Sequence, residues 1–135
     1  MMISFPLHST PRRWEPTMSK LRRQLLGILS IGHDTSMRGE GISLRDALHR
    51  TDYSSVRDRF DAKDLVPLVR ANPKFVDQWI AYSEDKRTSG GWWICLDPPS
   101  IGQVKASGSS IPFKTADEAI AEYVVRELDF WVTVK

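Results

Sequence analysis

The segment richest in functional groups is SEDKRTSGG at residues 83–91, which leads directly into the apolar block WWICL. It combines two acidic residues, two basic residues, three hydroxyls and two glycines. Cations beside glycines that expose their backbone N–H groups can bind an anion. A phosphate-binding loop, however, needs the order GxxxxGK[ST] and a helix after it, whereas this loop precedes a predicted strand. The segment therefore favours protein recognition, with a solvated connector as the alternative.

Two adjacent tryptophans follow this loop in the predicted strand 92–96. Side chains alternate along a strand, so Trp92 and Trp93 must point to opposite faces of the sheet. One of them belongs to the core, and the other lies on the outer face, where a partner or another element covers it. A strand buried on both faces is the competing interpretation. Since Arg and Trp are enriched at binding hot spots, the predicted partner-binding residues are Glu84, Asp85, Lys86, Arg87, Trp92 and Trp93.

Other residue types that could support catalysis or metal binding lack the spacing that those functions need. Cys95 lies within the apolar strand, and we interpret it as a small buried hydrophobe rather than a nucleophile. His8, His33 and His49 fall in separate segments without an i,i+4 pair, which indicates surface or capping roles rather than a metal site. We predict no catalytic residue, no metal and no cofactor.

Three aspartates at positions 58, 61 and 64 recur at every third residue. Carboxylates at short spacing can perform acid–base chemistry or bind Mg²⁺. Basic residues alternate with these aspartates, and two of the three are natural helix caps. We interpret them as structural.

Composition indicates one ordinary globular domain. The 135 residues are 41% hydrophobic and 27% charged, which suits a chain that buries a core without cross-links. A single cysteine rules out an internal disulfide and favours a reducing compartment, the cytoplasm. The chain has neither the apolar run of a membrane span nor the pattern of a signal peptide, so we expect no membrane association.

The net charge of +2 is unevenly distributed. Residues 1–50 carry 8 basic and 4 acidic residues, whereas residues 51–135 carry 11 basic and 13 acidic residues. A basic cluster near the N-terminus could bind phosphate backbones, or it could form the solvated face of a helix. The nucleic-acid-binding residues of this alternative are Arg12, Arg13, Lys20, Arg22 and Arg23.

Apolar periodicity and capping residues predict a helical N-terminal half after an extended arm at residues 1–16. The first helix runs from Thr17 to about Ile31, and we interpret Gly32 as its C-terminal stop. Ser43 is the predicted N-cap of a short helix, and Thr51 or Asp52 caps the next, with Tyr53, Val56 and Phe60 on one face. Asp64 is preferred over Asp61 as the following cap because Pro67 then lies closer to the first turn. Asn72-Pro73 begins a helix that ends near Tyr82.

The period then changes to that of strands. Residues 92–96 and 101–106 are predicted to pair across the turn at Asp97-Pro98-Pro99, and 111–113 form a short edge strand. Thr115-Ala-Asp-Glu118 is a capping box that begins the last helix, whose core face includes Trp131. The predicted fold class is α+β: a helical half, a small antiparallel sheet and a C-terminal amphipathic helix, forming one domain at residues 17–135.

The segment from Trp79 through YSEDKRTSGGWWI to FKTADEAIAEYVVRELDFW resembles small bacterial immunity proteins of contact-dependent and polymorphic toxin systems. The resemblance covers about the last 60 residues of the chain. It implies a non-enzymatic cytoplasmic protein that neutralises a toxin domain by occlusion. Many such proteins are strongly acidic, whereas this chain is slightly basic, which would suit a toxin with an acidic surface. The function expected from the sequence is therefore protein binding, and nucleic-acid binding is the alternative.

Overall fold

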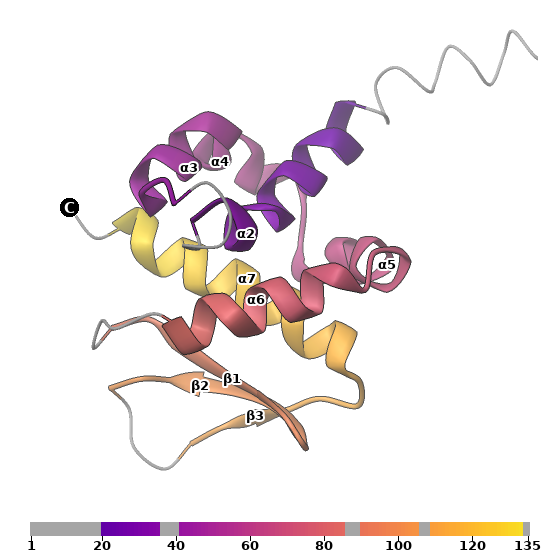
Figure 1. Ribbon diagram of the computed structural model, residues 1–135. Coiled ribbons are helices and arrows are strands. Elements are labelled where there is room, and N and C mark those ends of the chain that lie inside the picture. The colour runs from indigo at the N-terminus through magenta and orange to yellow at the C-terminus, as the bar shows by residue number, and fades with distance from the viewer. Residues whose placement is uncertain (1–19, 36–40, 86–89, 106–108, 134–135) are drawn as a thin grey trace, which may run out of the picture.

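The computed structural model describes residues 20–35, 41–85, 90–105 and 109–133. A series of helices precedes a three-stranded antiparallel sheet, and a long C-terminal helix follows it (Figure 1). This order confirms the predicted α+β class. The predicted extended arm at residues 1–16 lies outside the described residues.

The N-terminal helices are divided differently from the prediction. The described part of the first helix covers residues 20–29, and a second helix, α2 (Ile31–Thr35), follows after a turn at Ser30. Gly32 is therefore not a helix stop but a buried residue inside α2. A Cβ atom at Gly32 would lie 2.8 Å from Cδ2 of the Trp79 indole, so the absent side chain allows close packing between two helices.

The next three short elements follow from their capping residues. They are α3 (Leu44–Thr51), α4 (Tyr53–Val56) and the 3₁₀ turn η1 (Arg57–Arg59). Ser43 is the N-cap of α3, as predicted, and its hydroxyl accepts a hydrogen bond from Asp46 N at 3.1 Å. Asp52 has a left-handed backbone with φ of 54°, which turns the chain from α3 into α4.

The predicted capping of the following helix is wrong. Helix α5 (Ala62–Ala71) has Asp61 as its N-cap, and the Asp61 N–H donates to Oδ2 of Asp64 at 2.8 Å. The two aspartates act together in a capping box, with Asp64 at the third helical position. Pro67 consequently lies inside the helix, on its exposed side. Because proline has no backbone N–H, the hydrogen bond from residue 67 to the carbonyl of Lys63 is absent.

Helix α6 (Lys74–Asp85) begins at the predicted Asn72-Pro73 and extends past the predicted end at Tyr82. The Asn72 side chain donates to the carbonyl of Leu68 at 2.8 Å and so also caps the end of α5. Trp79 is fully buried, and its indole N–H donates to the carbonyl of Leu29 at 2.7 Å. This bond joins α6 to the end of the first helix.

The sheet has the order β1-β2-β3, with β1 (Trp92–Leu96), β2 (Pro99–Gln103) and β3 (Ile111–Pro112). Trp93 pairs with Gly102, and Ile94 pairs with Ile101. Strand β2 begins at Pro99, two residues before the predicted 101–106 strand. The predicted edge strand is confirmed as β3. Ile101 is fully buried and anchors the sheet to the core.

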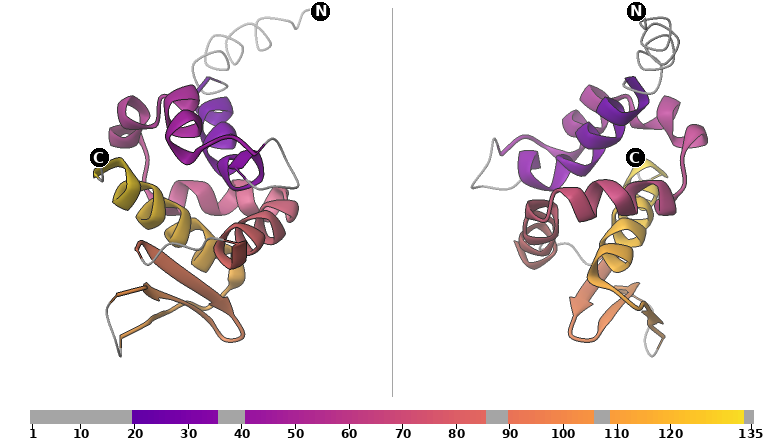
Figure 2. Two further views of the ribbon diagram at one scale, coloured as in Figure 1. Left: turned by 60° about the vertical axis from the view of Figure 1, so that its left-hand side comes forward. Right: turned by 90° about the vertical axis from the view of Figure 1, so that its right-hand side faces the viewer.

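Helix α7 (Ala116–Thr133) is the central element of the fold. It lies between the sheet and the N-terminal helices and contacts α3, α5, α6, β1 and β2 (Figures 1 and 2). The Thr115 hydroxyl caps it by accepting from Glu118 N at 3.2 Å, and Glu122 and Arg126 form an ion pair at 3.0 Å along the helix. Trp131 is only half-buried, so its predicted place in the core is wrong. No helix in the described ranges combines the length and apolar composition needed to cross a membrane.

Candidate functional site

The two tryptophans of β1 separate as the alternation rule requires. Trp92, Ile94 and Leu96 pack against the hydrophobic core, which places Trp93 and Cys95 on the opposite face of the strand. Figures 1 and 2 show the helices of the described chain on the same side of the sheet as α7. Trp93 is therefore the outward-facing tryptophan. Cys95 is exposed on that outer face, so the prediction of a buried cysteine is wrong.

The Trp93 indole lies across the neighbouring strand. A Cβ atom built at its pairing partner Gly102 would be 2.4 Å from Trp93 Cζ2 and 2.8 Å from Nε1. Only glycine leaves room for the ring to rest on the backbone of β2, which buries Gly102 and half-buries Trp93. The outer face of the sheet thus carries an aromatic side chain whose position is set by the backbone beneath it.

Trp92 is held against α7 by two contacts. The Arg126 guanidinium carbon lies 4.9 Å from the centre of the Trp92 ring, a cation–π arrangement. The Trp92 backbone N–H donates to Oε1 of Glu127 at 2.8 Å. These contacts fix the start of β1 relative to the C-terminal helix.

Glu127 is a fully buried carboxylate, which sequence reasoning did not identify as important. Its Oε2 accepts hydrogen bonds from the Tyr82 hydroxyl and from the Trp131 indole N–H, each at 2.8 Å. Burial raises the pKa of the Tyr82 phenol, and the negative charge of Glu127 raises it further. Glu127 therefore connects α6, β1 and the last turns of α7 through one side chain.

The predicted recognition loop is described only at its two ends. Glu84 and Asp85 are exposed in the last turn of α6, while Lys86 and Arg87 lie outside the described residues. At the other end, Gly90 faces α7 so closely that a Cβ atom there would lie 3.1 Å from the Phe130 ring. The structure thus places Glu84 and Asp85 on the element that precedes β1, with the end of the loop packed against α7.

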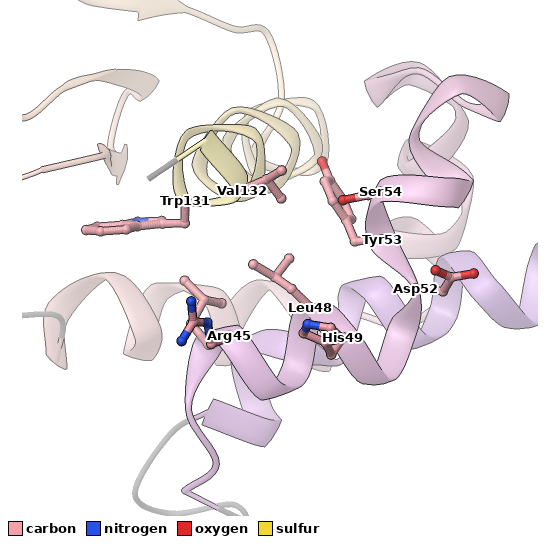
Figure 3. Close-up of a pocket in the computed structure, with 9 residues that line it drawn as sticks. Arg45, Leu48, His49, Asp52, Tyr53, Ser54, Trp131 and Val132 are labelled. Carbon is pink, nitrogen blue, oxygen red and sulfur yellow. The ribbon is translucent and has the colours of Figure 1, made fainter. Parts of the chain in front are cut away.

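A pocket that the sequence did not indicate lies between α3, α4 and the last turn of α7 (Figure 3). Its volume is about 550 Å³. Two of its walls face each other: Trp131 and Val132 on α7, and the apolar face of α3 with Leu48 (Figure 3). The lining residues are Leu44, Arg45, Leu48, His49, Asp52, Tyr53, Ser54, Trp131 and Val132.

A second hollow of about 570 Å³ shares Tyr53, Ser54 and Val132 with this pocket. At its base, Asp129 accepts hydrogen bonds from the Tyr53 hydroxyl at 2.7 Å and from Arg57 Nε at 2.9 Å. Burial raises the pKa of Tyr53, with a further contribution from the bond to Asp129, and that carboxylate also raises the pKa of Arg57. These three groups join α4 and η1 to α7.

The basic residues of the alternative function are partly described. Arg12 and Arg13 lie outside the described residues, whereas Lys20, Arg22 and Arg23 belong to the first helix. Lys20 and Arg23 line a hollow of about 410 Å³ together with Arg50 of α3, which the sequence did not connect with them. Two acidic residues, Asp34 and Asp52, line the same hollow, and Asp34 forms a 3.0 Å ion pair with Arg50.

The remaining candidates from the sequence are dispersed. His33 and His49 are exposed on different helices, and Asp58 is exposed in η1, while Asp61 and Asp64 form the capping box of α5. Among the residues with described positions, no three His, Cys, Asp or Glu side chains are grouped as a metal site. No protein-family model, curated protein or solved structure matches this chain.

Proposed function

We propose that this chain is a non-enzymatic cytoplasmic module that binds a protein partner and acts by occluding the partner's functional surface. The resemblance of its last 60 or so residues to bacterial immunity proteins supports a toxin domain as the partner. The observation that carries the proposal is the position of Trp93 on the sheet face opposite α7.

Trp93 has the properties of a binding anchor. Tryptophan is among the residues most enriched at hot spots, because its large ring removes much apolar surface from water when a partner covers it. Contact with Gly102 already restricts the ring in the free chain. Binding therefore loses less side-chain entropy at Trp93 than it would at a freely rotating aromatic residue.

The loop before β1 supplies the charges of the proposed surface. Glu84 and Asp85 are exposed at the end of α6, and Lys86 and Arg87 follow them in the sequence. Charges of both signs at a protein interface orient the partner and raise the association rate, more than they increase affinity. We expect salt to slow association while changing dissociation little.

The test is to immobilise the chain, capture partners from a lysate of its own host, identify any stoichiometric protein, and measure its affinity for purified variants. Trp93→Ala should weaken binding about 30-fold or more, the equivalent of at least about 2 kcal/mol for a hot-spot tryptophan. Val132→Ser is the matched control, because Val132 is an exposed apolar residue, 37% accessible, in the last turn of α7 and outside the Trp93 face. Equal affinity of wild type and Trp93→Ala, with both folded by circular dichroism, would refute this surface.

The second candidate function is nucleic-acid binding through the first helix. The observation that favours it is the hollow in which Lys20 and Arg23 come together with Arg50. Asp34 and Asp52 reduce the positive potential there, which is why this function ranks second. Fluorescence anisotropy with labelled DNA and RNA should show affinity falling steeply with salt, and Arg23→Gln should make that dependence shallower. Absence of binding at low salt would remove this candidate.

A further inference from the structure

The pocket between α3 and α7 has the dimensions of a small-molecule site. Its volume of about 550 Å³ falls within the range of roughly 300–1,000 Å³ that is common for such sites. Leu44, Leu48 and Val132 provide aliphatic surface, and the Trp131 indole provides an aromatic wall (Figure 3). An apolar group of a ligand would be removed from water between the two helices.

The aromatic wall is fixed in position before any ligand binds. The Trp131 indole N–H donates to the buried Glu127 carboxylate at 2.8 Å. Its ring also meets the Phe130 ring edge-on, with 4.9 Å between ring centres. A wall held in this way loses little conformational entropy on ligand binding, which is a property of preformed sites.

The two charged residues of the pocket lining, Arg45 and Asp52, have opposite signs. Arg45 and His49 lie four residues apart and so occupy the same side of α3. Among the ion pairs between described residues, none uses the exposed Arg45 guanidinium. Asp52, the acidic residue of the lining, is at the opposite end of the pocket from Trp131 (Figure 3). A ligand anion is therefore attracted to the Arg45 end.

We propose that this pocket binds a small amphipathic carboxylate. The apolar body of the ligand would lie between Leu48 and the pair Trp131 and Val132, and its carboxylate would pair with Arg45, whose planar guanidinium can bind a carboxylate through two parallel hydrogen bonds. An aryl-alkanoate of the size of 3-phenylpropionate fits this description. The proposal is independent of the protein-binding function, because the pocket and the Trp93 face use different residues.

The test is a ¹H–¹⁵N NMR titration with 3-phenylpropionate, and with 3-phenylpropanol as the matched neutral probe. The carboxylate should shift the Trp131 indole N–H resonance with a millimolar or lower dissociation constant, as expected for a ligand of this size. Arg45→Gln should weaken phenylpropionate binding about tenfold, the loss expected for a hydrogen-bonded charge pair, and leave phenylpropanol binding unchanged. Arg59→Gln, which removes an exposed arginine outside the pocket lining, should have no effect.

Val132→Glu serves as a second variant, because Val132 is exposed enough to accept a polar side chain without unfolding. It should abolish phenylpropionate binding by filling the pocket and repelling the carboxylate. Equal affinity for the acid and the alcohol would overturn the proposed role of Arg45. Absence of any Trp131 shift at about 10 mM ligand, a concentration that reveals even millimolar affinity, would overturn the site itself.

Discussion

Replacing Glu127 by glutamine should destabilise the fold far more than its isosteric shape suggests. The carboxylate is fully buried and accepts hydrogen bonds through both oxygens: Trp92 N–H on Oε1, and the Tyr82 hydroxyl and Trp131 indole N–H on Oε2. A glutamine side chain has one acceptor oxygen and one NH₂ group. Whichever way the amide is turned, its NH₂ faces a donor that the carboxylate had satisfied.

The size of the effect follows from these contacts. One unsatisfied donor in a buried site costs about 1–3 kcal/mol, and the remaining bonds lose the strengthening that a charged acceptor gives them. The expected loss for Glu127→Gln is about 2–4 kcal/mol of unfolding free energy. With an unfolding entropy of about 2.1 cal/mol/K per residue, this corresponds to a melting temperature lower by roughly 7–14 °C.

Urea unfolding of both proteins, compared at equal m-values, measures this loss. Glu122→Gln is the matched control on the same helix, because Glu122 forms a partly exposed pair with Arg126 that should contribute about 0.2–1 kcal/mol. An NMR spectrum of Glu127→Gln should also show a displaced Trp131 indole N–H resonance. If Glu127→Gln were within about 0.5 kcal/mol of wild type, the donors would not depend on the carboxylate and this reasoning would be wrong.

Three further outcomes can be checked with the isolated chain. Burial raises the pKa of all three tyrosines, Tyr53, Tyr82 and Tyr123. The stability that these neutral phenols contribute is complete below the ordinary phenol pKa of about 10 and should be lost as the pH rises above it. Ultraviolet absorbance should therefore show phenolate forming only together with the unfolding that circular dichroism detects. Phenolate appearing near pH 10 in a folded chain would contradict this. Gly32→Ala should cost about 1–3 kcal/mol by urea unfolding, since its methyl group would meet the Trp79 indole, and an unchanged midpoint would show that the helices separate without cost. Ser43→Ala should cost about 1 kcal/mol through loss of the α3 cap, and a neutral result would mean that water replaces the hydroxyl.

Local signals in the sequence were sufficient for most elements of the fold. Ser43 and Thr115 cap the helices that follow them, and the apolar run at 92–96 forms a strand, because these effects depend on residues a few positions apart. The errors occur where a distant residue determines the outcome. Gly32 has the residue type of a helix stop, yet its role is to let Trp79 approach from another helix.

The candidate site shows the same limit more strongly. Alternation separates Trp92 from Trp93, but only the placement of the helices on one side of the sheet decides which of the two faces outward. The same placement exposes Cys95, which the apolar run indicated as buried. Trp131 has helical core spacing, but the last turn of α7 extends past the core and instead lines the pocket with residues of α3. Contacts between such distant segments leave no local pattern in the sequence.

Hydrogen–deuterium exchange of the chain with its captured partner tests the central claim most directly. We predict that the partner slows amide exchange in β1 and β2 around Trp93 and at Glu84 and Asp85, and leaves the first helix unchanged. Lys20 to Arg23, at the start of the described first helix, provide the internal reference for an unbound surface. Protection confined to that helix, or exchange in the sheet that the partner does not alter, would contradict the assignment of the Trp93 face as the recognition surface.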